Sequence, residues 1–405
     1  MKKITALIML KVRCCAVSCV GIILILLAGG LAVDARAKEG DQQKKTSVLL
    51  KSAVTQHAVF DANRISNIMM NNGQYVSHLV TGNNGLEWPK GSGKLIDFAA
   101  GLWIAGKARS DGSIRTAVTE YASEYQPGKI LPNGQPDDPT LPKYRWYKIT
   151  SADLKDPGED YRGWPVGDGA PVDASGKPLL LGDQTLWCVF NDVDTSLHNR
   201  LFGTPPLGIE VQMTVWGYDR PEVWGDMMFV KATIIHKDTE TFDSTFIGLW
   251  DDADLGNASD DYIGCDTTLS LGYFWNATNN DEAYGAAPPA IGRAFLQGPI
   301  VHSPGDTASF LGRKLSGYRN LRMGAFSPNF KGSYPFRDPQ NAQEVFNYLR
   351  GRALDGSAFV NPLTGQKTLY YFTGDPETSS GWTESNPVRN AAGDRRFTMS
   401  TGPLL

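Results

Sequence analysis

The clearest structural signal in the chain is the heptapeptide IEVQMTV (Ile209–Val215), in which apolar side chains alternate with Glu, Gln and Thr. Successive side chains of a β-strand point to opposite faces, so this period of two predicts a strand with one buried face and one solvated face. Two apolar, β-branched segments follow, Met227–His236 and Thr245–Trp250. The polar residues 237–241 between them suit a turn, which predicts that these two strands form a hairpin.

The composition extends this interpretation to the whole chain of 405 residues. It contains 43 Gly, 24 Pro, 10 Trp and 15 Tyr, which is typical of many turns between short strands. We therefore predict a mainly β fold of β-sandwich-like sheets with long Gly/Pro-rich loops. One short C-terminal helix is expected, with Asp338 as N-cap, Pro339 as first helical residue and Gly351 as its end.

The first 37 residues are predicted to be a secretory signal peptide. Its start carries four positive charges, at Lys2, Lys3, Lys11 and Arg13. The run Cys14–Val33 is apolar and uncharged, and Ala35-Arg36-Ala37 fits a small-x-small cleavage pattern. An uncleaved membrane anchor is the alternative, because the run is almost long enough to span a bilayer. After cleavage we expect no stable membrane insertion.

The rest of the chain divides into a polar leader segment, residues 38–58, and a β-rich region, residues 59–405. Two packed subdomains, 59–185 and 186–405, could compose that region. The formal net charge is −4, and without the first 37 residues 34 basic residues face 42 acidic ones, a net charge of −8. This acidity argues against nucleic acid and anionic membrane surfaces as partners.

Acidic residues concentrate in one stretch, Asp251–Asp266, which places six aspartates within sixteen residues between apolar segments. We interpret it as a loop between two strands, with Gly256 and Gly264 supplying turn geometry. Calcium prefers six to eight hard oxygen ligands, so the stretch predicts a structural Ca²⁺ site. The predicted ligand set is Asp252, Asp254, Gly256, Asp260, Asp261 and Asp266.

Two other interpretations of this stretch remain open. One is a solvated acidic turn whose aspartates cap backbone amides, and the other is a catalytic carboxylate pair. The spacing is not that of an EF-hand, because Gly256 stands where that loop needs a third ligand and the twelfth position lacks glutamate.

Other catalytic chemistry finds little support. The five histidines are scattered, and the chain has no Cys-x-x-Cys pair, Walker A loop, dinucleotide fingerprint or G-x-S-x-G elbow. A carbohydrate-binding module or glycoside hydrolase is the rival class, because carboxylates and tryptophans are plentiful. An open cleft with two or more exposed tryptophans beside paired carboxylates would favour this rival. Most tryptophans, however, are expected to belong to the sheet core.

Cysteine usage leaves two possibilities open. Three of the five cysteines lie in the predicted signal peptide, and Cys188 and Cys265 remain after its removal. In an exported protein these two could form one disulfide, or each could be a buried thiol packed within a sheet.

Several phrases together resemble a family of large exported bacterial surface proteins. Full-length members often end in a type IX secretion sorting domain, sometimes after fibronectin type III-like modules. The similarity covers about residues 60–403. It rests on Glu87-Trp88-Pro89, Gly101-Leu102-Trp103-Ile104-Ala105-Gly106, Leu181-Gly182-Asp183-Gln184-Thr185-Leu186-Trp187-Cys188, Gly217-Tyr218-Asp219-Arg220, Gly248-Leu249-Trp250, Gly264-Cys265-Asp266, Pro288-Pro289-Ala290-Ile291-Gly292, Gln297-Gly298-Pro299, Asp394-Arg395-Arg396 and Ser400-Thr401-Gly402-Pro403.

The resemblance implies export across the outer membrane and a β-rich architecture, and it carries over no catalytic residue. Such proteins continue past the position of Leu405, so we expect this chain to be a fragment or a truncated product without the sorting domain. We expect a non-enzymatic, secreted or cell-surface protein, stabilised by Ca²⁺, with a structural or adhesive role. A surface glycan or an envelope protein is the expected partner.

Overall fold

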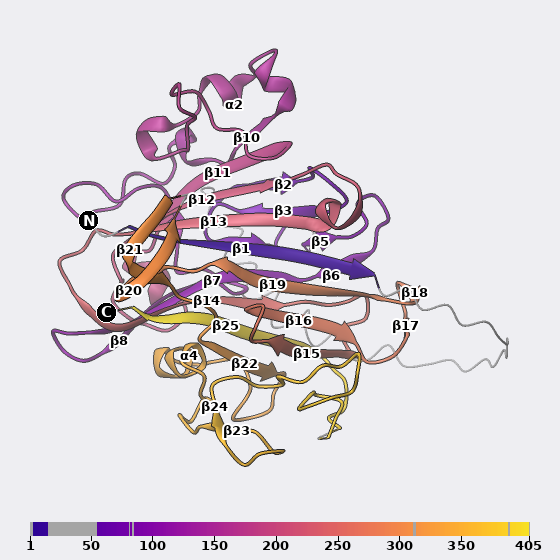
Figure 1. Cartoon of the computed structure of the whole chain (residues 1–405). Helices are drawn as coiled ribbons and strands as arrows, with labels where there is room; N and C mark the ends of the chain where they lie inside the picture. Colours follow the sequence, from indigo (N-terminus) through magenta and orange to yellow (C-terminus); the bar gives the residue numbers. More distant parts are fainter. Residues whose placement is uncertain are drawn as a thin grey trace.

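The computed structural model describes residues 3–14, 55–80, 82, 85–310, 313–387 and 389–404, and for residues 3–14 it describes the backbone alone. Within these residues the chain is mainly β with few helices, as predicted, and its strand ladders are antiparallel. Two large sheets dominate (Figure 1).

The larger sheet has nine strands, whose order does not follow the chain. The strand order across the sheet is β10 (Tyr147–Thr150), β11 (Gln184–Asn191), β12 (Ile209–Gly217), β13 (Met227–His236), β1 (Lys3–Cys14), β19 (Pro289–Gln297), β16 (Leu271–Asn276) and β15 (Asp261–Asp266). In addition, β9 (Gln126–Pro127) pairs with β11.

The second sheet has six strands and lies beside the lower part of the first in Figure 1. Its order is β22 (Ala325–Phe330), β25 (Arg395–Leu404), β14 (Phe242–Asp252), β7 (Ala99–Ala108) and β4 (Gln74–Val76), with β8 (Ile114–Val118) paired to β7.

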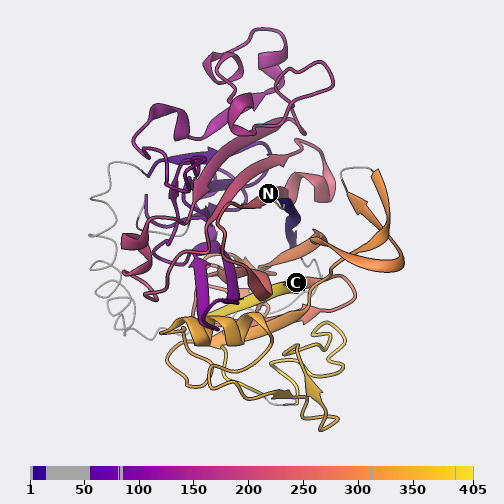
Figure 2. The ribbon, with the colours of Figure 1, turned by 90° about the vertical axis from the view of Figure 1, so that its left-hand side faces the viewer.

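Smaller elements decorate the two sheets. A four-stranded sheet comprises β2 (His57–Phe60), β3 (Ser66–Met70), β5 (Leu86–Glu87) and β6 (Leu95–Asp97). Three two-stranded ladders are β17 (Asn280–Asp281) with β18 (Gly285–Ala286), β20 (Ile300–Phe310) with β21 (Arg313–Asn320), and β23 (Phe359–Val360) with β24 (Lys367–Thr368). The β20–β21 hairpin projects from the body of the molecule (Figure 2).

Short helical turns fill the connections. They are η1 (Pro142–Tyr144), η2 (Ser151–Leu154), α2 (Glu159–Arg162), η3 (Val166–Asp168), α3 (Thr195–His198), η4 (Glu222–Asp226) and α4 (Ala342–Leu349).

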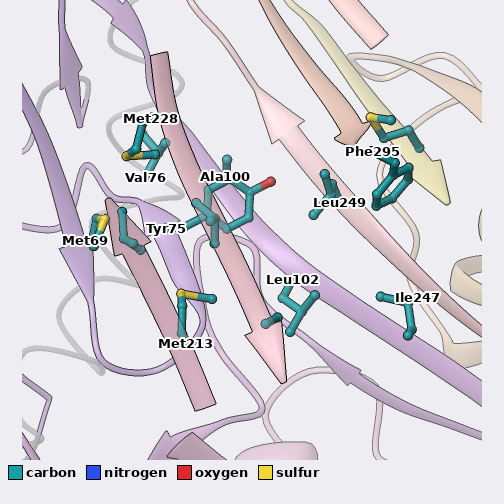
Figure 3. Close-up of a cluster of buried hydrophobic side chains, with 14 of the residues drawn as sticks. Met69, Tyr75, Val76, Ala100, Leu102, Met213, Met228, Ile247, Leu249 and Phe295 are labelled. Atoms are coloured by element: carbon teal, nitrogen blue, oxygen red, sulfur yellow. The ribbon is translucent and has the colours of Figure 1, made fainter. Parts of the chain in front are cut away.

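One hydrophobic core joins the sheets. Met213 and Met228 from the larger sheet meet Leu102 and Leu249 from the second sheet in one cluster of buried side chains (Figure 3). Met69 of β3 adds the four-stranded sheet to the same cluster. Each such side chain contributes about 1.5–3 kcal/mol when it leaves water, so this shared core holds the sheets face to face.

The polar face of the 209–215 strand is not solvated, contrary to the sequence prediction. β12 is buried along nearly its whole length, and the side chain of Glu210 is 1% exposed. Its carboxylate accepts a hydrogen bond from the backbone N–H of Ile130 at 2.9 Å and pairs with Lys237. The Gln212 amide donates to the carbonyl of Asp168 at 3.1 Å. The polar side chains Glu210 and Gln212 therefore hold the loop-rich segment 126–182 over this face.

The predicted hairpin between residues 227–236 and 245–250 is wrong. β13 and β14 exist, but β13 pairs with β12 and β1, whereas β14 pairs with β7 and β25. The polar residues 237–241 therefore carry the chain from one sheet to the other. Local turn chemistry alone does not determine which strand becomes the neighbour.

The predicted C-terminal helix is present as α4, but it begins later than expected. Asn341, not Asp338, is the N-cap, and its side chain accepts a hydrogen bond from the N–H of Glu344 at 3.0 Å. Asp338 instead accepts from the side-chain amide of Asn329 at 2.6 Å. Gly351, with φ of 69°, follows the helix as predicted.

The predicted signal peptide is only partly described. Its start, Lys3–Cys14, forms β1, whereas most of its apolar run and the Ala35-Arg36-Ala37 site lie outside the described residues, as do residues 38–54 of the leader segment. Both large sheets take strands from 59–185 and from 186–405, so a boundary at residue 185 would cut through both sheets.

Candidate functional site: an acidic corner and an aromatic cleft

The acidic stretch is not a single loop between two strands. β14 extends to Asp252, a short loop follows, and β15 begins at Asp261. The sequence analysis missed β15, because its aspartates suggested a turn. The signal that could have revealed it is the uncharged, largely apolar run Tyr262-Ile263-Gly264-Cys265 between the aspartates.

Three carboxylates converge at the end of β14. Ligand oxygens of Asp252, Asp254 and Asp394 lie within 4.8 Å of one another. Asp252 and Asp254 belong to the predicted calcium set, and both are buried. Asp394 was not predicted, because it precedes β25 and reaches the corner only through the pairing of β25 with β14. We call these three residues the acidic corner.

Cations and a phenol border the acidic corner. The Arg396 guanidinium lies 3.2 Å from Asp252 Oδ1 and 3.5 Å from Asp394 Oδ1. Lys331 Nζ lies 3.5 Å from Asp394 Oδ2. The Tyr121 hydroxyl donates to Asp252 Oδ2 at 2.6 Å. Three carboxylates thus face two positive side chains, which leaves the corner with an excess of negative charge.

Asp260, Asp261 and Gly256 lie in the adjoining loop and at the start of β15. Asp261 is buried, and its Oδ2 accepts from the N–H of Leu255 at 3.1 Å. Burial, followed by the nearby charges of Asp254 and Asp260, raises the pKa of Asp261 well above its ordinary range, and burial also raises the pKa of Asp260. Asp261 is therefore electrostatically coupled to the acidic corner.

Gly256 lies in a turn that packs against another aspartate, Asp281. Its φ is 76°, and a Cβ there would stand 2.2 Å from Asp281 Oδ1. Asp281 is buried, and its other carboxylate oxygen accepts from the N–H of Asn257 at 3.0 Å. The sequence analysis did not single out Asp281, which follows in the chain after β16.

Asp266 is separated from the other predicted ligands. It ends β15, five residues after Asp261, or about 17 Å at the rise of a strand. Its carboxylate accepts from the N–H groups of Thr268 at 2.8 Å and Leu269 at 3.0 Å. Partial burial opposes ionisation, but the hydrogen bond from the Thr268 hydroxyl and those from the two N–H groups outweigh it and lower the pKa of Asp266. Asp266 thus caps the β15–β16 turn.

A row of aromatic rings covers the outer face of β15 and β16. Tyr262 and Trp275 are directly opposite in the ladder, with ring centroids 5.5 Å apart, and Tyr273 follows 5.6 Å from Trp275. All three are half-buried, whereas the intervening Ile263 and Phe274 are fully buried beneath them. Strand alternation thus places the row on the side opposite the core.

Glycines give these rings room to lie close to the sheet. Gly264 is directly opposite Tyr273, and a Cβ on Gly264 would stand 2.8–3.0 Å from the Tyr273 ring and hydroxyl. On the other side of Tyr273, Gly292 of β19 is its ladder partner. Ring packing over a glycine of the neighbouring strand is a known way to cover exposed sheet backbone.

A cleft of about 880 Å³ opens above this row. The opposite wall comes from the segment 373–385, the yellow-orange part of the chain that lies near β15 in Figure 1. The Tyr273 hydroxyl donates to the Gly374 carbonyl at 3.2 Å, which joins the two walls. The polar lining includes Asp266, Thr268, Asn276, Asn279, Asp375, Glu377 and Ser385.

Most tryptophans are in the core, as expected from the sequence. Eight of the ten are buried, and the others are Trp275 in the cleft and Trp224, which is 50% exposed. Trp224 lines a separate depression with Tyr218 and Arg220. The two tryptophans therefore do not share a cleft. Two of the three rings in the aromatic row, Tyr262 and Tyr273, are tyrosines.

The two cysteines of the β-rich region are free. Cys188 on β11 and Cys265 on β15 are both buried thiols, so the possibility of a disulfide between them is ruled out in this structure. Burial raises the pKa of each thiol well above its ordinary value.

Comparison with known proteins does not place the chain in a family: neither a family model, a curated protein nor a solved structure matches it. Among the described residues, no helix combines the length and apolarity that a bilayer span requires.

Proposed function

We propose that this chain is an exported, non-enzymatic surface protein that binds glycans through the cleft on β15 and β16. The observation that carries the proposal is the row Tyr262, Trp275 and Tyr273, three half-buried rings in sequence along one open face. Export rests on the predicted signal peptide and on the resemblance to bacterial surface proteins. Adhesion to a glycan-coated surface is the role that unites these features.

The chemistry of the cleft suits a sugar chain. Aromatic faces offer an apolar surface with a negative quadrupole, against which the C–H face of a pyranose ring packs. Ligand sites combine such surfaces with a few polar groups that fix orientation. Here Asn276, Asn279 and Thr268 offer amide and hydroxyl groups for sugar hydroxyls, and Asp266 and Asp375 offer carboxylate acceptors.

Binding is favoured over hydrolysis by the ionisation of two carboxylates of the cleft, Asp266 and Asp375. A glycosidase needs one carboxyl that stays protonated to act as a general acid. In the cleft, hydrogen bonds from Thr378 and Glu377 lower the pKa of Asp375, and those from Thr268 and Leu269 lower the pKa of Asp266. Both groups are therefore ionised at neutral pH and suited to accept hydrogen bonds from a sugar.

A calcium ion at the acidic corner is the second part of the proposal. Asp252, Asp254 and Asp394 provide oxygen ligands of the type that Ca²⁺ prefers, and carbonyls or water would complete six or more. Bound there, the ion would neutralise the excess negative charge. Arg396 already neutralises part of this negative charge. We therefore expect weak affinity for Ca²⁺, with Kd of about 10⁻⁴–10⁻³ M, as in extracellular modules.

The glycan proposal is tested by probing the purified exported protein on an array of plant, fungal and bacterial oligosaccharides, followed by calorimetry with each that binds. The variant Trp275→Ala removes the central ring, and Trp224→Ala is the matched control, because it removes an exposed tryptophan outside the cleft. Stacking on an aromatic ring is worth about 1 kcal/mol or more, so we expect Trp275→Ala to weaken binding at least fivefold and Trp224→Ala to leave it unchanged.

Two results would contradict the proposal. A folded protein that binds no glycan, or one that binds equally well as Trp275→Ala, would remove the cleft from glycan recognition. Release of reducing ends from a bound oligosaccharide would instead show that the protein is a hydrolase.

A further inference from the structure

β1 occupies the middle of the nine-stranded sheet, between β13 and β19 (Figure 1). Its backbone pairs antiparallel with β13 over nine residues, Lys3–Lys11, and with β19 over eight residues, Leu7–Cys14. Among the described strands, no ladder joins β13 directly to β19. β1 therefore connects two halves of the sheet, β10 to β13 on one side and β19, β16 and β15 on the other.

This strand belongs to the predicted signal peptide. Cleavage after Ala37 would remove it and leave a slot one strand wide between β13 and β19. Neighbouring strands lie about 4.7–4.9 Å apart, so the two facing backbones would stand about 9–10 Å from each other, too far to pair directly. A buried backbone N–H or C=O group without a hydrogen-bond partner is unfavourable, so the slot favours the entry of another strand.

The slot opens directly onto the core. Met228, Val230, Ala232 and Ile234 of β13 are at most 4% exposed and belong to the main hydrophobic cluster. The residues of β1 in register with these four are Leu10, Ile8, Ala6 and Ile4, all apolar. At the intervening register positions of β13, Lys231 and Thr233 are only half-buried, whereas Phe229 and Ile235 are buried. An occupant therefore needs apolar residues at every second position and tolerates polar ones between them only opposite Lys231 and Thr233.

We propose that the slot between β13 and β19 is an acceptor site for an extended β-strand of a partner polypeptide. The inference depends on removal of the signal peptide and is independent of glycan binding. Both edges offer strand-spaced N–H and C=O groups, which an extended chain satisfies and a helix does not. The partner strand runs antiparallel to β13 and β19 and carries apolar residues in the register of Ile4, Ala6, Ile8 and Leu10.

The first measurement is the N-terminus of the protein recovered from the envelope of a host that processes bacterial signal peptides, determined by mass spectrometry. We expect it to start at Lys38. If the recovered protein retains residues 3–14, the slot is filled by the chain itself and the proposal is overturned.

The second measurement uses a fluorescent synthetic peptide with the sequence of Lys3–Cys14, carrying Ser in place of Cys14. Fluorescence anisotropy should show saturable binding to the processed protein and binding at least tenfold weaker to the full chain, in which β1 already occupies the slot. A cooperative thermal transition monitored by circular dichroism verifies that both forms are folded.

Three peptide variants test the register without altering the protein. Ile8→Pro removes a donor from a position paired on both sides, and Ala6→Asp places a charge opposite the buried Ala232; each should weaken binding at least tenfold. Thr5→Asp, opposite the half-buried Thr233, should change it less than threefold. No binding by the processed protein, or equal binding of Ile8→Pro, would overturn the proposal.

Discussion

The hydroxyl of Tyr262 donates a hydrogen bond to the backbone carbonyl of Asn390 at 2.8 Å. Tyr262 belongs to the aromatic row on β15, and Asn390 lies four residues before Asp394 of the acidic corner. The N–H of Gly393 also donates to the carbonyl of Asp261 at 3.2 Å. The segment before β25 thus fastens the acidic corner to the first ring of the cleft, so a cation in the corner should influence what the cleft binds.

Calcium should stabilise the folded protein. A ligand that binds only the folded state at 100 times its Kd adds about 2.7 kcal/mol to the free energy of unfolding. Thermal melting in calcium, in magnesium and in chelator should therefore show the highest Tm in calcium. Asp254→Asn should reduce the calcium-dependent shift, whereas the matched variant Asp266→Asn, at the far end of β15, should retain it. Equal Tm values in calcium and chelator would refute the metal site.

Chelation should also weaken glycan binding, through Tyr262. Tyr262→Phe keeps the ring but loses the hydrogen bond to Asn390, which is worth about 0.5–1.5 kcal/mol. We expect chelator to lower glycan affinity in the parent protein by about 2- to 10-fold, and by less in Tyr262→Phe. Tyr284→Phe is the control, because its hydroxyl bonds to the Trp88 carbonyl outside the cleft. Calorimetric titration in both buffers measures the effect, and identical affinities in calcium and chelator would disprove the coupling.

Strands with a strong local pattern could be predicted from the sequence. β13 begins at Met227 and ends at His236, as predicted, because its β-branched run is bounded by polar residues. The partners of a strand could not be predicted, since β14 pairs with β7 and β25 from distant parts of the chain. The burial of Glu210 could not be predicted either, because it depends on contacts with distant residues. The segment 126–182 packs over Glu210, and Lys237 pairs with its carboxylate.

The candidate site was located in the right stretch, but its members were only partly identified. Asp252 and Asp254 were chosen from local density of charge, which sequence displays directly. Asp394 could not be chosen in that way, because only the antiparallel pairing of β14 with β25 brings it near. Asp266 was included by sequence proximity, yet an extended strand of six residues carries it away from Asp261.

Asp192 should make stability depend on pH. Burial raises its pKa from 3.8 to about 6, against the opposing charge of His198 and hydrogen bonds from Ile209 and Leu207. The folded state therefore holds this proton more tightly than the unfolded state, so the contribution of Asp192 to stability falls as pH rises from about 4 to about 6. A shift of this size corresponds to about 3 kcal/mol.

Urea unfolding of the parent and of Asp192→Asn across pH 3.5–7.5 tests this expectation. The variant loses the titrating group, and with it one acceptor for the N–H groups of Leu207 and Ile209, so it should be less stable at low pH. The stability advantage of the parent should then shrink by up to about 3 kcal/mol as pH rises through 6. A difference that does not change with pH would contradict the raised pKa of Asp192.

Arg396 should act as the resident cation of the acidic corner. It is 3% exposed, lies 3.2 Å from Asp252 Oδ1, and donates to the Tyr121 hydroxyl at 2.6 Å. Arg396→Met leaves buried carboxylates without their counter-charge, and removal of one partner from such a buried pair costs about 3–5 kcal/mol. The negative charge left behind should raise affinity for Ca²⁺, so calcium should restore more stability to this variant than it adds to the parent.

Lys331→Met is the control, because the Lys331 side chain is 48% exposed and its ion pair with Asp394 is worth about 1 kcal/mol at most. Chemical unfolding of all three proteins with calcium and with chelator measures the differences. An Arg396→Met protein whose stability responds to calcium no more than that of the parent would show that Arg396 does not compete with calcium at the acidic corner.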